Sequence, residues 1–394
     1  MRSVSEAITT LLEAGKRLVE PEMIDLIDAT GRTLADDVIA QIDVPPADNS
    51  AMDGYAIRHA DWPASGRGVP VSQRITAGSV PVELEPGSAA RIFTGAEIPS
   101  GADSVVMQEH CEESGGVLQI LKLPAPGANI RRRGQDLSSG QKVLCKGQRL
   151  RPQDLGLAAS LGLAQIPVFR RLTVAVMSTG DELREPGDRL EPGQIFNSNR
   201  YTMKSQLSCW GFKVVDMGVA RDEPDAVREM MTRAAALADV VITSGGVSVG
   251  EEDHVKAVVE SLGAIDLWRI AVKPGKPFAF GQVCGKPFIG LPGNPVSVFV
   301  TMLVIARPYL FACQGNADTR VHAVPHTALF ERSGSQREEY LRVRATGRGV
   351  ELFPNQSSGV LFSTTWGDGL VRQAPGEDIK QGSRVEYLPY QLFN

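Results

Sequence analysis

Four loops rich in glycine and small polar residues carry the side chains that could do chemistry. They cover residues 178–183, 243–250, 273–277 and 290–297, and each adjoins a short apolar stretch typical of a buried strand. Glycine lets a backbone approach an anion and present its N–H groups, and a following helix N-terminus adds partial positive charge. One such loop is usually an ordinary turn. Four loops at one edge of one sheet favour an anionic ligand.

Within these loops, small residues and cations are the candidate anion contacts. Lys273 and Lys276 flank a Pro-Gly turn, which suits a phosphate or another oxyanion, although a solvated hairpin tip explains them equally well. Asn294 and Pro295 read as a helix N-cap followed by proline at the first helical position, which is a structural explanation on its own. The candidate cradle residues are Ser178, Thr179, Gly180, Gly245, Gly246 and Ser248.

Carboxylates occur beside the same loops, at Asp181, Glu182, Asp222 and Asp253. They would repel an anion unless a divalent cation lay between, and Mg²⁺ suits a few carboxylates completed by water and phosphate oxygens. We therefore expect a divalent metal among these carboxylates. Asp222 and Asp253 have a structural alternative, since each could cap the helix that follows it.

Two other kinds of site can be weighed against this one. Residues 246–250 match the G-x-S-x-G pattern of a hydrolase, but three acids after Ser248 would oppose a developing oxyanion. His322 and His326 could share a helix face and bind a metal, but Pro325 and extended surroundings disfavour that helix. Both interpretations are minor.

The elements that must position these residues are predicted from secondary-structure patterns that change along the chain. An amphipathic helix is predicted over 5–20, a turn-rich β segment follows, and a helix-prone stretch covers 155–163. Strands and helices then alternate, which predicts a mostly parallel three-layer α/β sheet, and the last stretch is strand-like again. We expect an N-terminal helical and linker domain over 1–40 and 140–170, an inserted β-rich domain over 41–139, an α/β domain over 171–318 and a small C-terminal β-barrel over 319–394.

Composition excludes several classes of partner. The 394 residues include 41 basic and 46 acidic side chains, a formal net charge of −5, which is a poor basis for binding nucleic acid or an anionic membrane. The longest mostly apolar run, over 296–305, is too short to span a membrane, and the N-terminus lacks a secretory apolar stretch. Five cysteines without metal-binding spacing suit free thiols in the cytoplasm.

The β-rich segment contains a further dense patch. It reads NSAMDGYA over 49–56, RIFTGA over 91–96 and RRRGQD over 131–136. The triple arginine is either a solvated face or an anion contact.

Taken in order, these motifs together with STGDEL, TSGGVSVGEEDHV, VKPGKPFAFG and GLPGNPVS resemble the molybdopterin molybdenumtransferase family, which includes MoeA and the gephyrin E domain. The resemblance extends from about residue 4 to about 315. It implies that the α/β domain binds molybdopterin and that molybdate is inserted into adenylated molybdopterin with release of AMP. It also implies Mg²⁺ and a homodimer whose site lies between the α/β domain of one subunit and the β-rich region of the other.

The resemblance also assigns residues. It implies catalytic roles for Asp53, Asp136, Glu182, Asp222 and Asp253, and metal binding by the last three. Arg269 stands where the family usually has lysine, and its planar guanidinium keeps the charge but changes the geometry. The remaining implied substrate contacts are Thr94, Lys273, Lys276, Pro292, Pro295, Ser297 and, in the C-terminal part, Arg342 and Ser358.

Two alternatives stay open at this point. A related α/β domain could instead transfer AMP onto molybdopterin, or the chain could act as a non-catalytic cofactor carrier or scaffold. The SAMDGYA region favours insertion over adenylylation, and the lack of a long disordered linker disfavours a scaffold. Transient contacts with a molybdopterin adenylyltransferase and with apoproteins of molybdenum enzymes are also conceivable.

Overall fold

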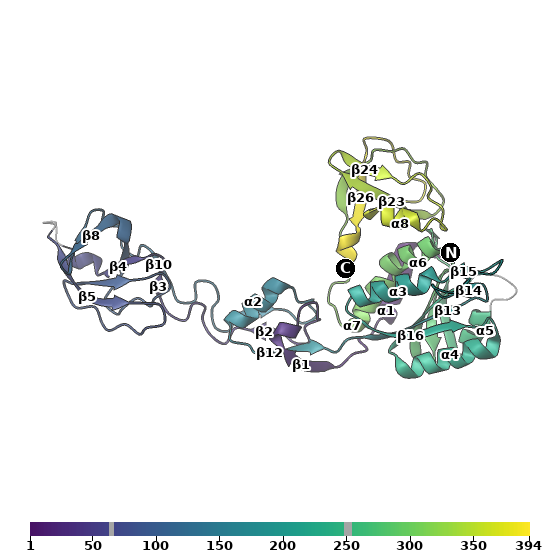
Figure 1. Ribbon diagram of the computed structural model, residues 1–394, viewed down its shortest axis with the longest axis horizontal. Helices are drawn as coiled ribbons and strands as arrows, with labels where there is room; N and C mark the ends of the chain where they lie inside the picture. The colour runs from purple at the N-terminus through teal and green to yellow at the C-terminus, as the bar shows by residue number, and fades with distance from the viewer. Residues whose placement is uncertain (63–66, 248–253) are drawn as a thin grey trace. The chain divides into compact units, whose positions relative to one another are not determined.

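The computed structural model describes residues 1–62, 67–247 and 254–394, and the chain forms two compact units (Figure 1). The main unit contains Met1–Asp36, Lys146–Arg151 and Gln165–Asn394, and the inserted unit contains Asp37–Cys145 and Pro152–Ala164. The inserted unit is wider than the segment 41–139 expected from the sequence. The reason is that strand β2 pairs with β11 at the base of the insertion, and helix α2 groups with it.

A six-stranded sheet forms the centre of the main unit, in the order β16-β13-β17-β21-β20-β18. The first four strands run parallel, whereas β20 is antiparallel to both of its neighbours. A mostly parallel sheet was predicted, and the hairpin between β20 and β21 is its antiparallel exception. The strands are β13 (Thr173–Thr179), β16 (Lys213–Ala220), β17 (Val240–Ser244), β18 (Gly263–Trp268), β20 (Ala279–Val283) and β21 (Lys286–Leu291).

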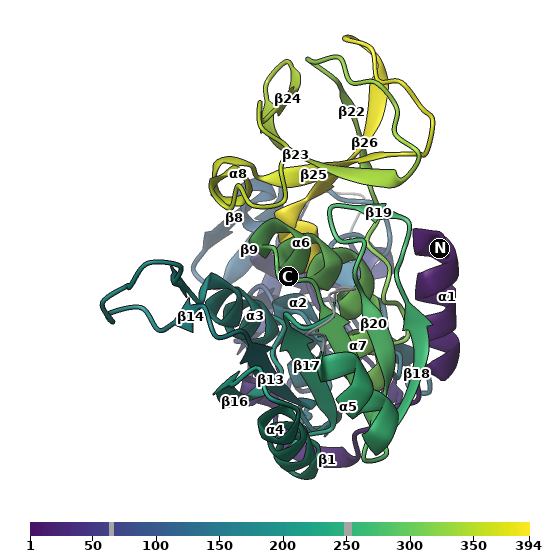
Figure 2. The ribbon, with the colours of Figure 1, turned by 90° about the vertical axis from the view of Figure 1, so that its right-hand side faces the viewer.

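Helices cover both faces of this sheet, and strand β13 shows why (Figure 2). Its residues alternate between the faces: Val174 and Val176 pack in one apolar cluster, and Ala175 and Met177 pack in another. The first cluster holds α1 (Val4–Ala14), α3 (Ser198–Cys209), α6 (Pro295–Thr301) and α7 (Arg307–Gln314), and the second holds α4 (Pro224–Leu237) and α5 (His254–Leu262). The result is the expected three-layer α/β domain.

One continuous helical run lies deep in this core. Helix α6 passes through the π-helical turn η4 (Met302–Ala306) into α7, so the run covers Pro295–Gln314. The π turn comes just before Pro308, which has no N–H to donate to the preceding turn. The run is long and apolar enough to cross a membrane, which corrects the shorter apolar run read from the sequence. However, 83% of its most apolar window is buried inside the protein, as in a core helix.

The C-terminal strands form a small barrel with its own apolar core. They follow the order β19-β23-β25-β26-β22, and β24 also pairs with β23. A bridge between Ala328, just after β22, and Val350 of β24 joins the two ends of the sheet. Strand β19 belongs in sequence to the α/β domain, so the barrel is joined to that domain by a strand pair. The strands are β19 (Val272–Lys273), β22 (Val324–Thr327), β23 (Glu338–Thr346), β24 (Gly349–Leu352), β25 (Gly369–Gln373) and β26 (Arg384–Pro389), with helix α8 (Phe362–Trp366) and turn η5 (Tyr390–Phe393).

The inserted unit is built on a second six-stranded sheet, in the order β7-β4-β6-β5-β9-β8. Its strands are β4 (Gly54–Ile57), β5 (Val69–Ile75), β6 (Ala89–Ile92), β7 (Ser104–Met107), β8 (Cys111–Ser114) and β9 (Val117–Ile120), with turns η2 (His59–Asp61) and η3 (Gln108–His110). Shorter pairs join β2 (Val38–Ile39) to β11 (Lys142–Leu144) and β3 (Asn49–Ser50) to β10 (Ile130–Arg131), and α2 covers Pro152–Ser160. In the main unit, β1 (Pro21–Asp25) pairs with β12 (Gln165–Phe169), turn η1 covers Leu26–Asp28, and β14 (Leu183–Arg184) pairs with β15 (Ile195–Phe196).

Several local expectations from the sequence need correction. The first helix ends at Ala14, because Gly15 leaves the helical conformation. Asp222 is not a helix cap, since α4 begins at Pro224 with Glu223 as its N-cap residue. Asn294 takes the N-cap position of α6, but its side chain makes no capping hydrogen bond. His326 lies in strand β22, so it cannot share a helix face with His322.

Candidate functional site

The four predicted loops lie along one edge of the main sheet. Strands β13, β17 and β21 run parallel, so the loops that follow them all leave from the same side. Strand β18 runs in the same direction as β21, because both are antiparallel to β20, and the loop over 269–278 therefore emerges on that side too. This is the edge where α/β proteins bind ligands.

The first two loops touch through their backbones. Gly245 and Gly246 have left-handed φ angles of 89° and 63°. A Cβ on Gly245 would lie 2.7 Å from the Thr179 carbonyl oxygen, and a Cβ on Gly246 would lie 2.3 Å from Val255 Cγ2. Only glycine fits at both positions, and the Gly245 N–H donates to the Leu291 carbonyl at 3.3 Å.

Two of the predicted cradle residues are buried beneath this edge. The Ser178 hydroxyl is fully buried and lies 3.4 Å from the Ser244 hydroxyl, and Thr179 is 5% exposed. Ser178 and Thr179 pack beneath the loops, whereas Gly180 is partly exposed and Gly293 is exposed. Pro292 is buried, and the Gly293 carbonyl accepts a 2.7 Å hydrogen bond from Asn199 Nδ2. Ser248 lies outside the described residues.

The lysine loop is closed by its own backbone. The Arg269 N–H donates to the Phe278 carbonyl and the Ile270 N–H donates to the Lys276 carbonyl, at 2.9 and 3.1 Å. Gly275 lies against helix α6, where a Cβ would meet Thr301 Cγ2 at 2.4 Å. The side chain of Lys276 is exposed. Arg269 has a left-handed φ of 71°, which non-glycine residues rarely adopt.

Three carboxylates lie at the ends of β13 and β16, where Thr179 pairs with Ala220. Asp181 Oδ1 accepts a hydrogen bond from the Asp222 N–H at 3.2 Å. The Glu182 carboxylate lies over Gly180, with Oε2 2.5 Å from the place of a Cβ there. Asp253 lies outside the described residues. Across the part of the chain that is described, no three His, Cys, Asp or Glu side chains converge as a metal cage.

The start of helix α6 meets a loop of the C-terminal barrel. The Val296 N–H donates to the Ser358 carbonyl at 3.1 Å, which places Ser358 at the same helix terminus as Pro295. Ser297, one turn in, is 3% exposed, and its carbonyl accepts a hydrogen bond from the Thr301 hydroxyl. Of these, Ser358 and Pro295 are at the helix start, whereas Ser297 is packed inside.

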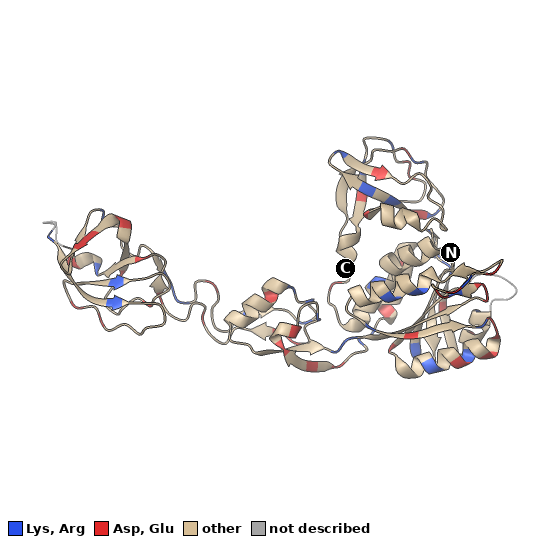
Figure 3. Cartoon of the chain, viewed as in Figure 1, with Lys and Arg blue, Asp and Glu red and all other residues tan. Residues whose placement is uncertain are grey.

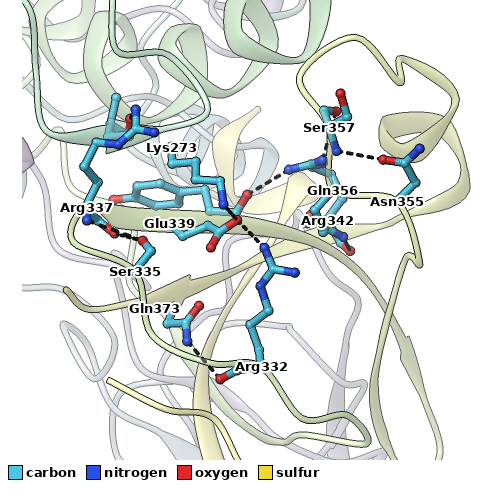
Figure 4. Close-up of polar contacts among 12 residues, drawn as sticks. Lys273, Arg332, Ser335, Arg337, Glu339, Arg342, Asn355, Gln356, Ser357 and Gln373 are labelled. Carbon is cyan, nitrogen blue, oxygen red and sulfur yellow. Dashed lines mark hydrogen bonds and ion pairs between the residues drawn. The ribbon is translucent and has the colours of Figure 1, made fainter. Parts of the chain in front are cut away.

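Arg342 holds this barrel loop rather than facing the open edge (Figure 4). Its side chain is fully buried and donates to the Ser357 carbonyl, the Tyr340 carbonyl and the Ser363 hydroxyl, while its N–H donates to Gln356. Burial lowers the pKa of the Arg342 guanidinium to about 10. Arg342 therefore acts as an internal brace for the loop that carries Ser358.

The inserted unit contributes a separate polar corner. Asp53 Oδ1 accepts two hydrogen bonds from Thr94, one from its N–H and one from its hydroxyl, both at 2.7 Å. These bonds lower the pKa of Asp53, so the carboxylate stays charged, and the residue is partly exposed. Asp136 is exposed, with its N–H bonded to the Val44 carbonyl.

The triple arginine is largely tied up within the inserted unit. Arg132 pairs with Asp48 and Arg133 pairs with Asp43, each at 2.6 Å. These ion pairs favour the solvated-face interpretation for both residues. Positive and negative side chains are mixed throughout both units (Figure 3).

Sequence reasoning missed two charged residues beside the lysine loop. Glu339 is 1% exposed and receives Lys273 at 3.1 Å and Arg332 at 2.9 Å on the same oxygen. The signal was present in the sequence, because two adjacent acids open a strand over 338–343 in which Tyr340, Leu341 and Val343 are suited to burial. A carboxylate inside such a strand needs a cationic partner.

The domain layout and the candidate site together are those of a multidomain enzyme whose α/β domain is of the kind that binds a nucleotide or a cofactor. Comparison with known families agrees along most of the chain. Residues 2–162 match the MoeA N-terminal region (domain I and II), residues 175–312 a probable molybdopterin binding domain, and residues 330–390 the MoeA C-terminal region (domain IV).

Individual relatives agree with the family models. A molybdopterin molybdenumtransferase of Haemophilus influenzae is 44% identical, over 80% of this chain and 78% of its own length. One of Synechococcus elongatus is 35% identical over 98% of both chains. The crystal structure of a molybdopterin biosynthesis MoeA protein from Pyrococcus horikoshii superposes with a TM-score of 0.83 at 31% identity, covering 100% of this chain and 99% of that one. This chain belongs to the MoeA family of molybdopterin molybdenumtransferases.

Proposed function

We propose that this chain inserts molybdate into adenylated molybdopterin and releases AMP, in a reaction that requires Mg²⁺. Its place in molybdenum cofactor biosynthesis follows from family membership. The observation that best supports the finer statement is the shared edge of the α/β sheet, where glycine backbones, lysines and carboxylates occur together. A pyrophosphate-bearing ligand needs N–H groups and cations, and carboxylates beside it need a metal.

The carboxylates at this edge fit Mg²⁺ by their chemistry. Glu182 lies over Gly180, Asp222 adjoins Asp181 at the same edge, and both side chains carry hard oxygen donors. Asp253 follows the neighbouring strand in sequence. When bound, the metal would neutralise phosphate oxygens during transfer. The residues of this chain do the rest: the backbone at Gly246, which has no Cβ, lets the phosphates approach closely, and Lys273 and Lys276 attract the oxyanion.

We further propose that the chain works as a homodimer in the cytoplasm, with Asp53, Thr94 and Asp136 of one subunit completing the site of the other. Asp53 is held as a fixed anionic group by its two hydrogen bonds from Thr94, and the nearby Arg91 also favours its charged form. A fixed anion of this kind suits a site shared between subunits. Five free cysteines support a reducing compartment. Mixing two inactive variants, Asp53→Ala and Lys273→Gln, tests the shared site: activity should return in mixed dimers.

The reaction is tested with purified protein, adenylated molybdopterin, molybdate and Mg²⁺. AMP release and reactivation of an apoprotein that needs the molybdenum cofactor are the expected results. Absence of both would reject insertion. Consumption of ATP with unadenylated molybdopterin would instead identify the adenylylation step.

A further inference from the structure

The lysine loop of the α/β domain is held by the C-terminal barrel. Strand β19 pairs in parallel with β23, so that Lys273 lies opposite Glu339 in the register. The Arg337 guanidinium adds a 3.1 Å hydrogen bond to the Val272 carbonyl, and the Glu338 N–H donates to Ala271. The barrel therefore fixes the backbone of the loop over residues 271–273, which leads into and includes Lys273.

The Lys273 side chain is then held by a buried carboxylate (Figure 4). Glu339 Oε1 forms an ion pair with Lys273 Nζ at 3.1 Å and accepts a hydrogen bond from Arg332 Nη2 at 2.9 Å. Glu339 is 1% exposed, whereas the Lys273 side chain is 37% exposed. The other carboxylate oxygen of Glu339, Oε2, is buried and has no hydrogen-bond partner within the described residues. The Glu339 carboxylate therefore interacts with Lys273 and Arg332 through Oε1.

The charge count of this cluster leaves a surplus. Two cations share one carboxylate, so one positive charge is in excess among these three side chains, and Lys273 is partly exposed to solvent. An ammonium has three donors, so Lys273 keeps donors for a second anion beside its ion pair with Glu339. Lys273 can therefore bind an incoming oxyanion while Glu339 keeps its Nζ in place.

We infer that Glu339 is a positioning residue for oxyanion binding, acting through Lys273, with Arg332 as the second cation that fixes the carboxylate. The inference rests on the proposed function, in which Lys273 contacts the oxyanion. A preorganised ammonium binds its ligand without first losing side-chain freedom. Glu339 itself is too deeply buried to touch the ligand.

Substitution of Glu339 distinguishes a role in positioning Lys273 from a simple effect of its negative charge on the local potential. If the carboxylate only lowers the local positive potential, Glu339→Gln should strengthen molybdate binding, because a negative charge has been removed near an anion site. If it positions Lys273, the same change should raise the KM for molybdate about tenfold, as for other hydrogen bonds to charged groups, with a smaller change in kcat. Glu339→Asp, which keeps the charge on a shorter arm, should recover part of the affinity.

A double-mutant comparison shows whether the effect passes through Lys273. In a Lys273→Gln background, Glu339→Gln should cost nothing further, and additive losses would overturn the inference. Glu386→Gln is the matched control, since this acid pairs with Arg372 in the same barrel at 2.9 Å and lies outside the site. It should leave the KM for molybdate unchanged.

A direct measurement covers the case in which Glu339→Gln folds poorly. Amine-reactive labelling of Lys273, read by mass spectrometry, should be faster in Glu339→Asp than in the unmodified protein, because the shorter carboxylate releases the ammonium. Equal labelling rates would overturn the positioning role whatever the catalytic activity. Failure of the unmodified protein to release AMP would count against the proposed function alone.

Discussion

The α/β edge and the Asp53 corner, both of which the proposed function places at a ligand, hold their polar groups in place by opposite means. At the edge, the polar groups belong to the backbone, and glycine is required because a Cβ on Gly246 would collide with Val255. At the corner, the polar group is a side chain held by two hydrogen bonds from Thr94. Function and folding are therefore inseparable at the edge and separable at the corner.

The largest effect is expected from Gly246→Ala. Its left-handed φ and the 2.3 Å approach to Val255 together should cost about 3 kcal/mol in the free energy of unfolding. Gly193→Ala is the matched control, because its φ is 87° but nothing lies within 4 Å of a Cβ there. That control should lose only about 1 kcal/mol. Equal losses in urea melts would mean that close approach does not matter at the edge.

Asp53→Ala should show the opposite pattern. We expect insertion to fall by more than about 100-fold, a size typical of losing a preorganised polar group, with an unchanged Tm. Asp61→Ala removes a comparable acid of the inserted unit, one that accepts the Gly87 N–H at 3.0 Å, and should retain activity. A large drop in the Tm of the Asp53 variant would show that the corner is as structural as the edge.

The support behind the edge can be tested by pH. Partial burial opposes ionisation of Asp216, but hydrogen bonds from Arg200, Lys204 and the Gly218 N–H outweigh it and lower its pKa to about 2. A depressed pKa stabilises the fold above the unfolded value of about 4, and the gain is lost as pH falls toward 2.

Asp216→Asn should therefore cost about 2 kcal/mol at neutral pH and almost nothing near pH 2. Urea unfolding of both proteins across this range measures the gap. A gap that stays constant down to pH 2 would show that charge is not the source.

The smallest effect is expected at the carboxylates of the edge. Glu182→Gln should raise the Mg²⁺ concentration needed for half-maximal activity about tenfold, as for changes around other metal sites. Asp188→Asn, an exposed acid further along the same segment, is the control and should not change it. An unchanged requirement in Glu182→Gln would remove Glu182 from metal binding.

Much of the α/β domain was predictable because its signals are local. The run LTVAVMS became β13, and the helix before Gly211 became α3, since apolar periodicity and a terminating glycine fix both. The edge was predictable for the same reason, as parallel strands place the loops after β13, β17 and β21 on one side.

The missed features depend on contacts between distant segments. The residues around Glu339 in the sequence do not identify Lys273 as its partner. The two side chains meet only because β19 of the α/β domain pairs with β23 of the barrel. Arg342 was read as a ligand contact, yet its surroundings make it a brace, since the barrel loop folds back over it. Asp222 was misjudged as a cap because Pro224 sets the helix start.

The pairing of β19 with β23 also bears on the order of events during synthesis. The ribosome makes the lysine loop well before it makes Glu339, so a nascent chain can complete its α/β sheet while Lys273 is still unanchored. Under the proposed function, the Lys273 ammonium is then positioned for the oxyanion only once the barrel has been made. A chain that stops before Glu339 should therefore complete its α/β sheet but bind the oxyanion weakly.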